Sequence, residues 1–367
     1  MDCCDFELVK KIMASEEVIE NGDGKIIVKA VPDNDVTGLM DKREFFIRSA
    51  IYAFQKSVPS KFSIEGMRQT TKTYCKDMCT KDIEESSFDI DVKGRSVKVF
   101  SYVLAEKKAE TLPAMIYIHG GSFMASKAEF YKEPCRYVAE NLGIRVFNVD
   151  YSLAPENVYP AAIEDVLAAA DHIFANSAER GVDKEHIGLF GDSAGANLAL
   201  AAILDNKDEV KFTYAGLFYP CVDMYSQEKL YDWDISMYEI AEEQAELITS
   251  RLQLGRADGK GNNDLMANIL FAYSGGRYDE VKRNPDVSPI YADLSSMPYT
   301  GIFTAEYDGL RVQAEYYSRL LDKAGIPNKH IRYRGVSHAF LDYFGILPQA
   351  QAALLEMCDQ IRKVWGI

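Results

Sequence analysis

The chain has 367 residues, enough for two average domains or for one large α/β domain with an added cap. Hydrophobic residues make up 47% of it, which excludes a globally disordered chain. The formal net charge of −15 disfavours nucleic acids and anionic lipids as partners, because no basic stripe remains to displace their counterions.

Several features predict a soluble, cytoplasmic protein. The longest apolar stretch, residues 198–204, is far shorter than the roughly 18 residues that span a bilayer. The first residues, MDCCD, are acidic where a secretory signal would be basic. An odd number of cysteines, scattered along the chain, indicates reduced thiols rather than a disulfide framework. A homodimer is compatible with all of these features, which leave the oligomeric state open.

The first 85 residues are charged and predicted to be rich in helix. Apolar residues recur there at spacings of three and four, as on one apolar helix face. These residues are Phe46, Ile47, Ala50, Ile51, Phe54 and Val58. Two runs of alternating polarity follow, at residues 88–92 and 96–103, and the Lys-Gly-Arg turn between them predicts a β-hairpin.

From residue 114 onwards, short apolar runs alternate with helical segments. Strands are predicted at residues 114–118, 144–149, 187–190, 214–219, 299–304 and 330–333. Helices are predicted at residues 161–174, 196–204 and 312–324, and from residue 348. This alternation indicates a mostly parallel sheet with helices on both faces. Residues 221–285 interrupt the pattern, so we expect a helix-rich N-terminal segment (1–85) and one α/β core in two parts (86–220 and 286–367) with an insertion (221–285) between them.

A candidate nucleophile lies between the strand at 187–190 and the helix at 196–204. Residues 191–195 read GDSAG, and a serine on such a sharp turn projects its hydroxyl above the sheet. An ordinary glycine-rich turn would explain the same letters, so Ser193 also needs a base. Of the five histidines, His338 alone follows a predicted strand in a loop, at the edge where a parallel sheet gathers its site.

Two further parts of a catalytic site follow predicted strands. Glu306 and Asp308 come after the strand at 299–304, and either carboxylate could orient His338. The order serine, acid, histidine is that of α/β-hydrolases. Residues 119–123, HGGSF, follow the strand at 114–118 and place consecutive N–H groups where an oxyanion would need donors.

Together these motifs resemble the hormone-sensitive-lipase-like family of α/β-hydrolases. The matching pieces are HGG at 119–121, DYSLAPE at 150–156, YPAA at 159–162, GDSAG at 191–195, TAEYD at 304–308 and HAF at 338–340. The resemblance implies an α/β-hydrolase fold with a helical cap, which would be formed by residues 1–85 and part of the insertion at 221–285. It also implies a triad of Ser193, Asp308 and His338, which favours Asp308 over Glu306.

The same resemblance implies an oxyanion hole. Its donors would be the N–H groups of Gly121, Ser122 and Ala194, with Gly120 shaping the loop. Ser122 stands where the family usually has a third glycine, and Ala339 stands where a glycine usually follows the histidine. These departures affect specificity rather than the reaction.

The function predicted from the resemblance is a serine carboxylesterase that hydrolyses short-chain acyl esters of small molecules and needs no cofactor. Two alternatives stay open. The same triad could serve a deacetylase or amidase acting on an acetylated small molecule or sugar. A non-catalytic small-molecule receptor could use the same fold, although such receptors typically lose a triad member.

Metal sites are weakly indicated. Asp33, Asp35 and Glu44 have the spacing of calcium ligands, but the preceding residues 25–28 read as a strand rather than as the entering helix. Thr37 as the N-cap of the following helix would explain the same residues. Cys75 and Cys79 lie four residues apart, and no second Cys or His pair completes a zinc site. We therefore predict no metal.

Overall fold

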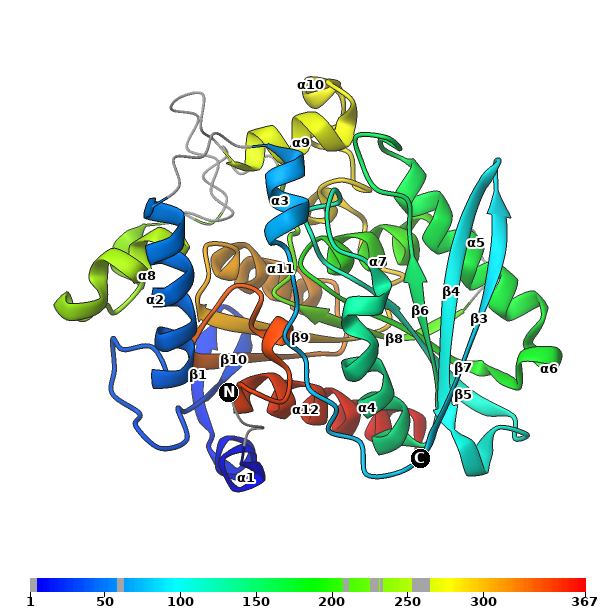
Figure 1. Cartoon of the computed structure of the whole chain (residues 1–367), viewed down its shortest axis with the longest axis horizontal. Helices are drawn as coiled ribbons and strands as arrows, with labels where there is room; N and C mark the ends of the chain where they lie inside the picture. Colours follow the sequence, from blue (N-terminus) through cyan, green and yellow to red (C-terminus); the bar gives the residue numbers. More distant parts are fainter. Residues whose placement is uncertain (1–4, 58–62, 207–210, 225–230, 232–233, 253–264) are drawn as a thin grey trace.

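The structure of the chain is a computed structural model, and it describes residues 5–57, 63–206, 211–224, 231, 234–252 and 265–367. Within these residues, ten strands form one sheet in the order β1-β2-β10-β9-β8-β7-β5-β6-β4-β3 (Figure 1). The strands are β1 (Glu17–Asn21), β2 (Gly24–Lys29), β3 (Ile83–Val92), β4 (Arg95–Leu104), β5 (Leu112–Ile118), β6 (Arg145–Asp150), β7 (Val182–Asp192), β8 (Phe212–Phe218), β9 (Tyr299–Tyr307) and β10 (Asn328–Ser337).

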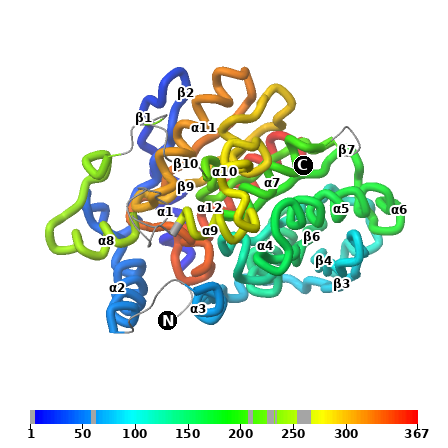
Figure 2. Tube along the Cα trace, turned by 90° about the horizontal axis from the view of Figure 1, so that it is seen from above, coloured from blue at the N-terminus to red at the C-terminus, as the bar shows by residue number. Residues whose placement is uncertain are grey.

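The middle of the sheet is parallel, from β2 across to β6, and an antiparallel hairpin lies at each end. Figure 2 shows the two hairpins, β1-β2 and β3-β4, at opposite ends of the molecule. The central strands β5 and β7 are apolar and buried along most of their length, as expected for strands covered on both faces. The predicted α/β architecture and the hairpin at 88–103 are confirmed.

Helices cover both faces of the sheet. The helices are α1 (Phe6–Ala14), α2 (Lys42–Ser57), α3 (Ile64–Thr70), α4 (Lys132–Leu142), α5 (Ala161–Ala175), α6 (Ser177–Arg180), α7 (Ala194–Asp205), α8 (Ala245–Leu252), α9 (Leu265–Ser274), α10 (Tyr278–Val281), α11 (Arg311–Lys323) and α12 (Pro348–Trp365). One core cluster lies between the sheet and α5, α7 and α11, and a second one lies against α1, α4 and α12. None of the described helices is long and apolar enough to cross a membrane.

The N-terminal segment departs from the prediction of a helical cap over residues 1–85. Strand β2 pairs in parallel with β10 and extends the central sheet, with Ile26 opposite His330. Residues 26–28 are β-branched, which favours a strand, and Ile26 and Val28 are buried in the sheet. Part of the predicted cap segment therefore belongs to the core sheet.

Helix α2 confirms the predicted helix, but its apolar face is only partly buried. Ile47 is buried, whereas Phe46 is 65% exposed and Phe54 is 62% exposed; Val58 lies outside the described residues. The N-cap prediction for Thr37 is wrong. The helix begins at Lys42, where the Asp41 carboxylate accepts from the N–H of Arg43 at 2.8 Å.

Candidate active site

Ser193 lies on a sharp turn between β7 and α7. Its backbone has φ 52° and ψ −116°, a conformation that a non-glycine residue adopts only when its surroundings hold it there. The flanking glycines make this possible, because a Cβ on Gly191 would lie 2.6 Å from the carbonyl oxygen of Ile118, and one on Gly195 only 2.1 Å from the same atom. The turn therefore presents the serine hydroxyl at the carboxyl end of the strand.

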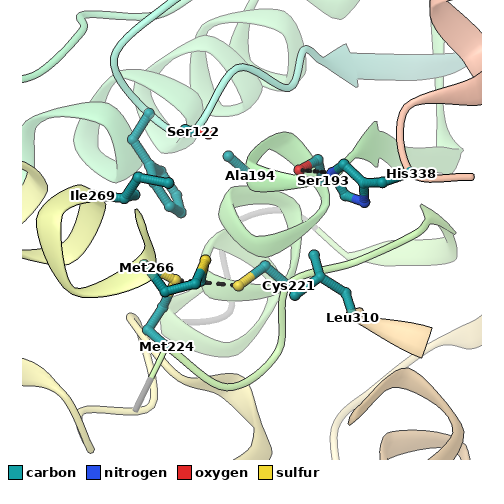
Figure 3. A pocket seen from close by; sticks show the side chains of 10 residues that line it. Ser122, Ser193, Ala194, Cys221, Met224, Met266, Ile269, Leu310 and His338 are labelled. Carbon is teal, nitrogen blue, oxygen red and sulfur yellow. Dashed lines mark hydrogen bonds between the residues drawn. The ribbon is translucent and has the colours of Figure 1, made fainter. Parts of the chain in front are cut away.

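His338 lies directly after β10, and its Nε2 is 2.9 Å from the Ser193 Oγ (Figure 3). The ring of Tyr219 packs edge-on against the imidazole, with 4.9 Å between the ring centroids. The remaining histidines have other partners: His119 is buried beside the carbonyl of Gly120, and His330 faces Thr304. The histidine selected by its position after a strand is therefore the one that meets the serine.

The carboxylate on the other side of His338 belongs to Asp308. Its Oδ2 is 2.8 Å from the His338 Nδ1, and its Oδ1 accepts from the N–H of Leu310 at 2.8 Å. Glu306 lies elsewhere, where its Oε2 accepts from the N–H of Gly335 at 2.7 Å. Of the two acids, Asp308 is therefore the one that contacts His338. The buried Tyr238 hydroxyl also donates to the carbonyl of Asp308 at 2.9 Å, a contact that no sequence motif indicates.

The loop after β5 supplies the candidate oxyanion donors. The N–H of Gly120 donates to the buried Asp192 carboxylate at 2.7 Å, so Gly120 shapes the loop and its own donor is occupied. Gly121 has φ 120°, and a Cβ there would lie 2.1 Å from the carbonyl oxygen of Ala125. Among the described residues, the N–H groups of Gly121, Ser122 and Ala194 make no hydrogen bond, which leaves three donors beside Ser193.

Asp192 is a residue whose role the sequence analysis missed. Its carboxylate also accepts from the Tyr117 hydroxyl, and burial raises the pKa of this carboxyl above its usual value. The bonds from Tyr117 and Gly120 tie the strand before Ser193 to the oxyanion loop. The signal that the sequence offered is the aspartate in the GDSAG motif, because a carboxylate beside a buried turn needs hydrogen-bond donors.

A small apolar pocket of about 150 Å³ opens beside Ser193 and His338 (Figure 3). Most of the other residues that line the pocket are apolar. The full set is Ser122, Phe123, Ala194, Cys221, Met224, Met266, Ile269 and Leu310. Met266 and Ile269 come from α9, in the predicted insertion. Tyr231, in the same insertion, donates through its hydroxyl to the Asp223 carboxylate at 2.8 Å.

The calcium-like loop pairs its acids with cations. Asp33 lies 2.7 Å from the Lys42 ammonium, and Asp35 lies 3.0 Å from the Arg334 guanidinium. Glu44 points into the protein, where it binds Arg48 at 2.9 Å. These carboxylates therefore do not converge on one point. In the described part of the chain, no three His, Cys, Asp or Glu side chains are grouped to hold a metal ion.

The sheet, the elbow serine and the Ser-His-Asp contacts define an α/β-hydrolase. A protein-family model described as "alpha/beta hydrolase fold" matches residues 115–342, and the chain belongs to this family. An arylesterase from Saccharolobus solfataricus is 29% identical over 293 residues, covering 77% of this chain and 86% of that protein. An acetyl esterase from Salmonella typhi is 30% identical over 241 residues, covering 65% of this chain and 69% of that protein.

The solved structures agree with this assignment. A hyperthermophilic esterase from Pyrobaculum calidifontis superposes with a TM-score of 0.70 at 27% identity, covering 88% of this chain and 98% of that one. The family predicted from the motifs is therefore confirmed.

Proposed function

We propose that the protein is a serine carboxylesterase that hydrolyses short-chain acyl esters of small molecules through an acyl-enzyme on Ser193. The observation that carries the proposal is the unbroken chain of contacts from the Ser193 Oγ through His338 to Asp308. The names of two relatives, arylesterase and acetyl esterase, support the same class of reaction.

The mechanism follows from the positions of the groups. As the Ser193 Oγ attacks the ester carbonyl, His338 Nε2 takes its proton, and the Asp308 carboxylate stabilises the imidazolium. The negative charge that forms on the carbonyl oxygen is bound by the N–H groups of the oxyanion loop and of Ala194. His338 then gives the proton to the leaving alcohol, and a water molecule activated in the same way hydrolyses the acyl-enzyme.

The pocket supports a short acyl group. A cavity of about 150 Å³ lined by apolar side chains accommodates a group about the size of benzene. Each buried methylene stabilises the bound substrate by about 0.8 kcal/mol, but only while the pocket has room for it. We therefore expect kcat/KM to rise from acetyl to about hexanoyl esters and to fall for longer chains.

Hydrolysis of p-nitrophenyl esters from acetyl to palmitoyl tests this function, with Ser193→Ala as the control. We expect Ser193→Ala to lose activity and a fluorophosphonate to label Ser193 alone. Full activity in that variant, or a label found elsewhere, would overturn the mechanism; a steady rise through palmitoyl esters would overturn the short-chain specificity. A matched pair, p-nitrophenyl acetate and p-nitroacetanilide, separates an esterase from an amidase.

We also propose that the protein works in the cytoplasm on a small-molecule ester, without nucleic acid or membrane as a partner. The five cysteines of the described residues are all unpaired, which fits a reducing compartment. Localisation of the tagged full-length chain tests this part.

A further inference from the structure

The main-chain carbonyl of His338 is held by two arginines that come from distant parts of the chain. Arg48 on α2 donates to this oxygen through its Nη2 at 2.9 Å, and Arg251 on α8 donates to it through its own Nη2 at 3.0 Å. Both helices belong to segments predicted to form the cap, and Figure 1 shows them side by side. Two cap elements therefore meet at the residue that contacts Ser193.

A buried carboxylate and the serine bonded to it connect the two arginines to the strand that leads to His338. Glu44, one turn before Arg48, binds the Arg48 Nε at 2.9 Å and accepts from the N–H of Ser337 at 3.1 Å. The Ser337 hydroxyl donates to the same Glu44 oxygen and accepts from the Arg251 Nε at 3.2 Å. The second oxygen of Glu44 is buried and makes no hydrogen bond among the described residues. The cluster thus closes around the last residue of β10.

This arrangement is unfavourable for the positive charge of Arg251. Burial lowers the pKa of the Arg251 guanidinium to about 9, and the nearby positive charge of Arg48 acts in the same direction. Glu44 and Arg48 are buried, and the Arg251 guanidinium reaches the Glu44 carboxylate only through the Ser337 hydroxyl. Apolar side chains of similar size would pack α2 and α8 without this penalty. The cluster therefore points to a need at the His338 loop rather than to stability.

The loop that begins at His338 has an unusual backbone conformation, which the two arginines contact. Ala339, the next residue, has φ 65°, a left-handed conformation that residues other than glycine rarely adopt. Arg48 also reaches the carbonyl of Ala339, at 3.4 Å. The turn that aims the imidazole at Ser193 is thus strained, and the arginines bind both carbonyl groups of its first peptide units.

We propose that Arg48 and Arg251 are positioning residues, which hold the main chain of His338 so that its imidazole faces the Ser193 hydroxyl only when α2 and α8 are docked. This inference rests on the proposed function of His338 as the base. It makes the cap segments part of the catalytic apparatus, although neither arginine touches the acyl pocket.

The test is a double-mutant cycle with Arg48→Met and Arg251→Met, assayed with p-nitrophenyl butyrate. We expect each single variant to lose about fivefold to tenfold in kcat, with KM changed by less than threefold, because the loop is disturbed and the pocket is not. Since either arginine alone still holds the carbonyl, the double variant should lose more than the product of the two single effects. Arg251→Lys, which keeps a donor and the charge, should recover part of the loss.

The matched control is Lys56→Met. Lys56 also joins α2 to α8, through an exposed ion pair with Glu246 at 2.7 Å, but this pair does not contact the His338 loop. We expect kcat within twofold of the wild type. We divide each rate by the amount of serine that a fluorophosphonate labels at completion, so that unfolded protein does not lower the measured kcat. If the Met variants do not fold, the kcat of Arg251→Lys alone tests the proposal, and we expect it to be at least threefold below that of the wild type.

The outcomes separate the two proposals. If Ser193→Ala is inactive while the arginine variants keep kcat within twofold, the positioning role is overturned and the esterase assignment stands. An equal loss in Lys56→Met also overturns it, because docking of the helices in general would then be the cause. If Ser193→Ala stays active, the proposed function itself fails.

Discussion

Replacing Asp308 by asparagine is the sharpest test of the candidate triad, because the structure dictates how the amide would be oriented. The Leu310 N–H donates to one oxygen of Asp308 at 2.8 Å and will select the amide oxygen of an asparagine. The amide NH₂ then faces the Nδ1 of His338, which lies 2.8 Å from the other oxygen. That nitrogen must accept, so Nε2 carries the proton and cannot take one from Ser193.

The magnitude follows from this tautomer argument. In serine proteases, the corresponding change lowers kcat by about 10⁴, equivalent to about 5 kcal/mol in the activation barrier. Tyr238, which donates to the main-chain carbonyl of Asp308, keeps residue 308 in place and allows little compensating movement. We expect kcat for p-nitrophenyl butyrate to fall by a factor of about a hundred to ten thousand, with KM changed by less than threefold.

Glu306→Gln is the matched control, since it removes the other acid of the same segment. Its amide oxygen can still accept from the Gly335 N–H, so kcat should change by less than tenfold. The melting temperature of each variant, measured by differential scanning fluorimetry, shows whether it is folded. A folded Asp308→Asn enzyme with more than a tenth of wild-type activity, or an inactive but folded Glu306→Gln, would refute the assignment.

Three further predictions concern the surroundings of the site. Burial, and secondarily the charge of Asp192, raises the pKa of Asp342 to about 7. Between pH 4 and pH 7 the folded state therefore holds a proton that the unfolded chain has released, and the stability of the fold decreases as the pH rises through this range. In urea titrations, the free energy of unfolding of the wild type should decrease between pH 5.5 and pH 8 by about 2 kcal/mol more than that of Asp342→Asn. An equal decrease in both proteins would contradict the pKa shift. Ile269→Trp should fill the acyl pocket, lowering kcat/KM for hexanoyl esters at least tenfold and for acetyl esters less than threefold, and a uniform loss would show that Ile269 does not limit chain length. Gly195→Ala places a methyl group 2.1 Å from the Ile118 carbonyl oxygen, so it should lower the free energy of unfolding by about 3 kcal/mol, measured by thermal unfolding. It should also abolish fluorophosphonate labelling of Ser193. Normal labelling would mean that the turn around Ser193 can widen.

The central sheet could be predicted because its strands carry their signal locally. Strand β5 is a short, buried apolar run, β7 contains one at residues 187–190, and a glycine-rich turn follows each strand. Ser193 and His338 could be predicted because each lies directly after a strand of the sheet. Whether a residue directly follows a strand can be recognised from the local sequence, and active sites of parallel sheets form at the carboxyl ends of their strands.

The choice between Glu306 and Asp308 could not be made from the pattern, because it depends on where one strand ends. The predicted strand stopped at residue 304, whereas β9 continues to Tyr307. Glu306 is therefore still a strand residue, bonded to the neighbouring strand at Gly335, and Asp308 is the first residue free to turn towards His338. Strand ends are set by pairing partners, which a single sequence does not reveal.

The N-terminal segment shows the same limit at longer range. Nothing in residues 17–29 indicates that they pair with β10, more than three hundred residues later, and β1 is too exposed to produce an apolar run. Yet this pairing brings the chain to the edge of the sheet from which His338 emerges. Helix α2, which follows β2 in the chain, then lies near enough for Arg48 to bind the His338 carbonyl. The N-terminal hairpin therefore contributes to the site indirectly: it brings α2, and with it Arg48 and Glu44, to the loop that carries the histidine.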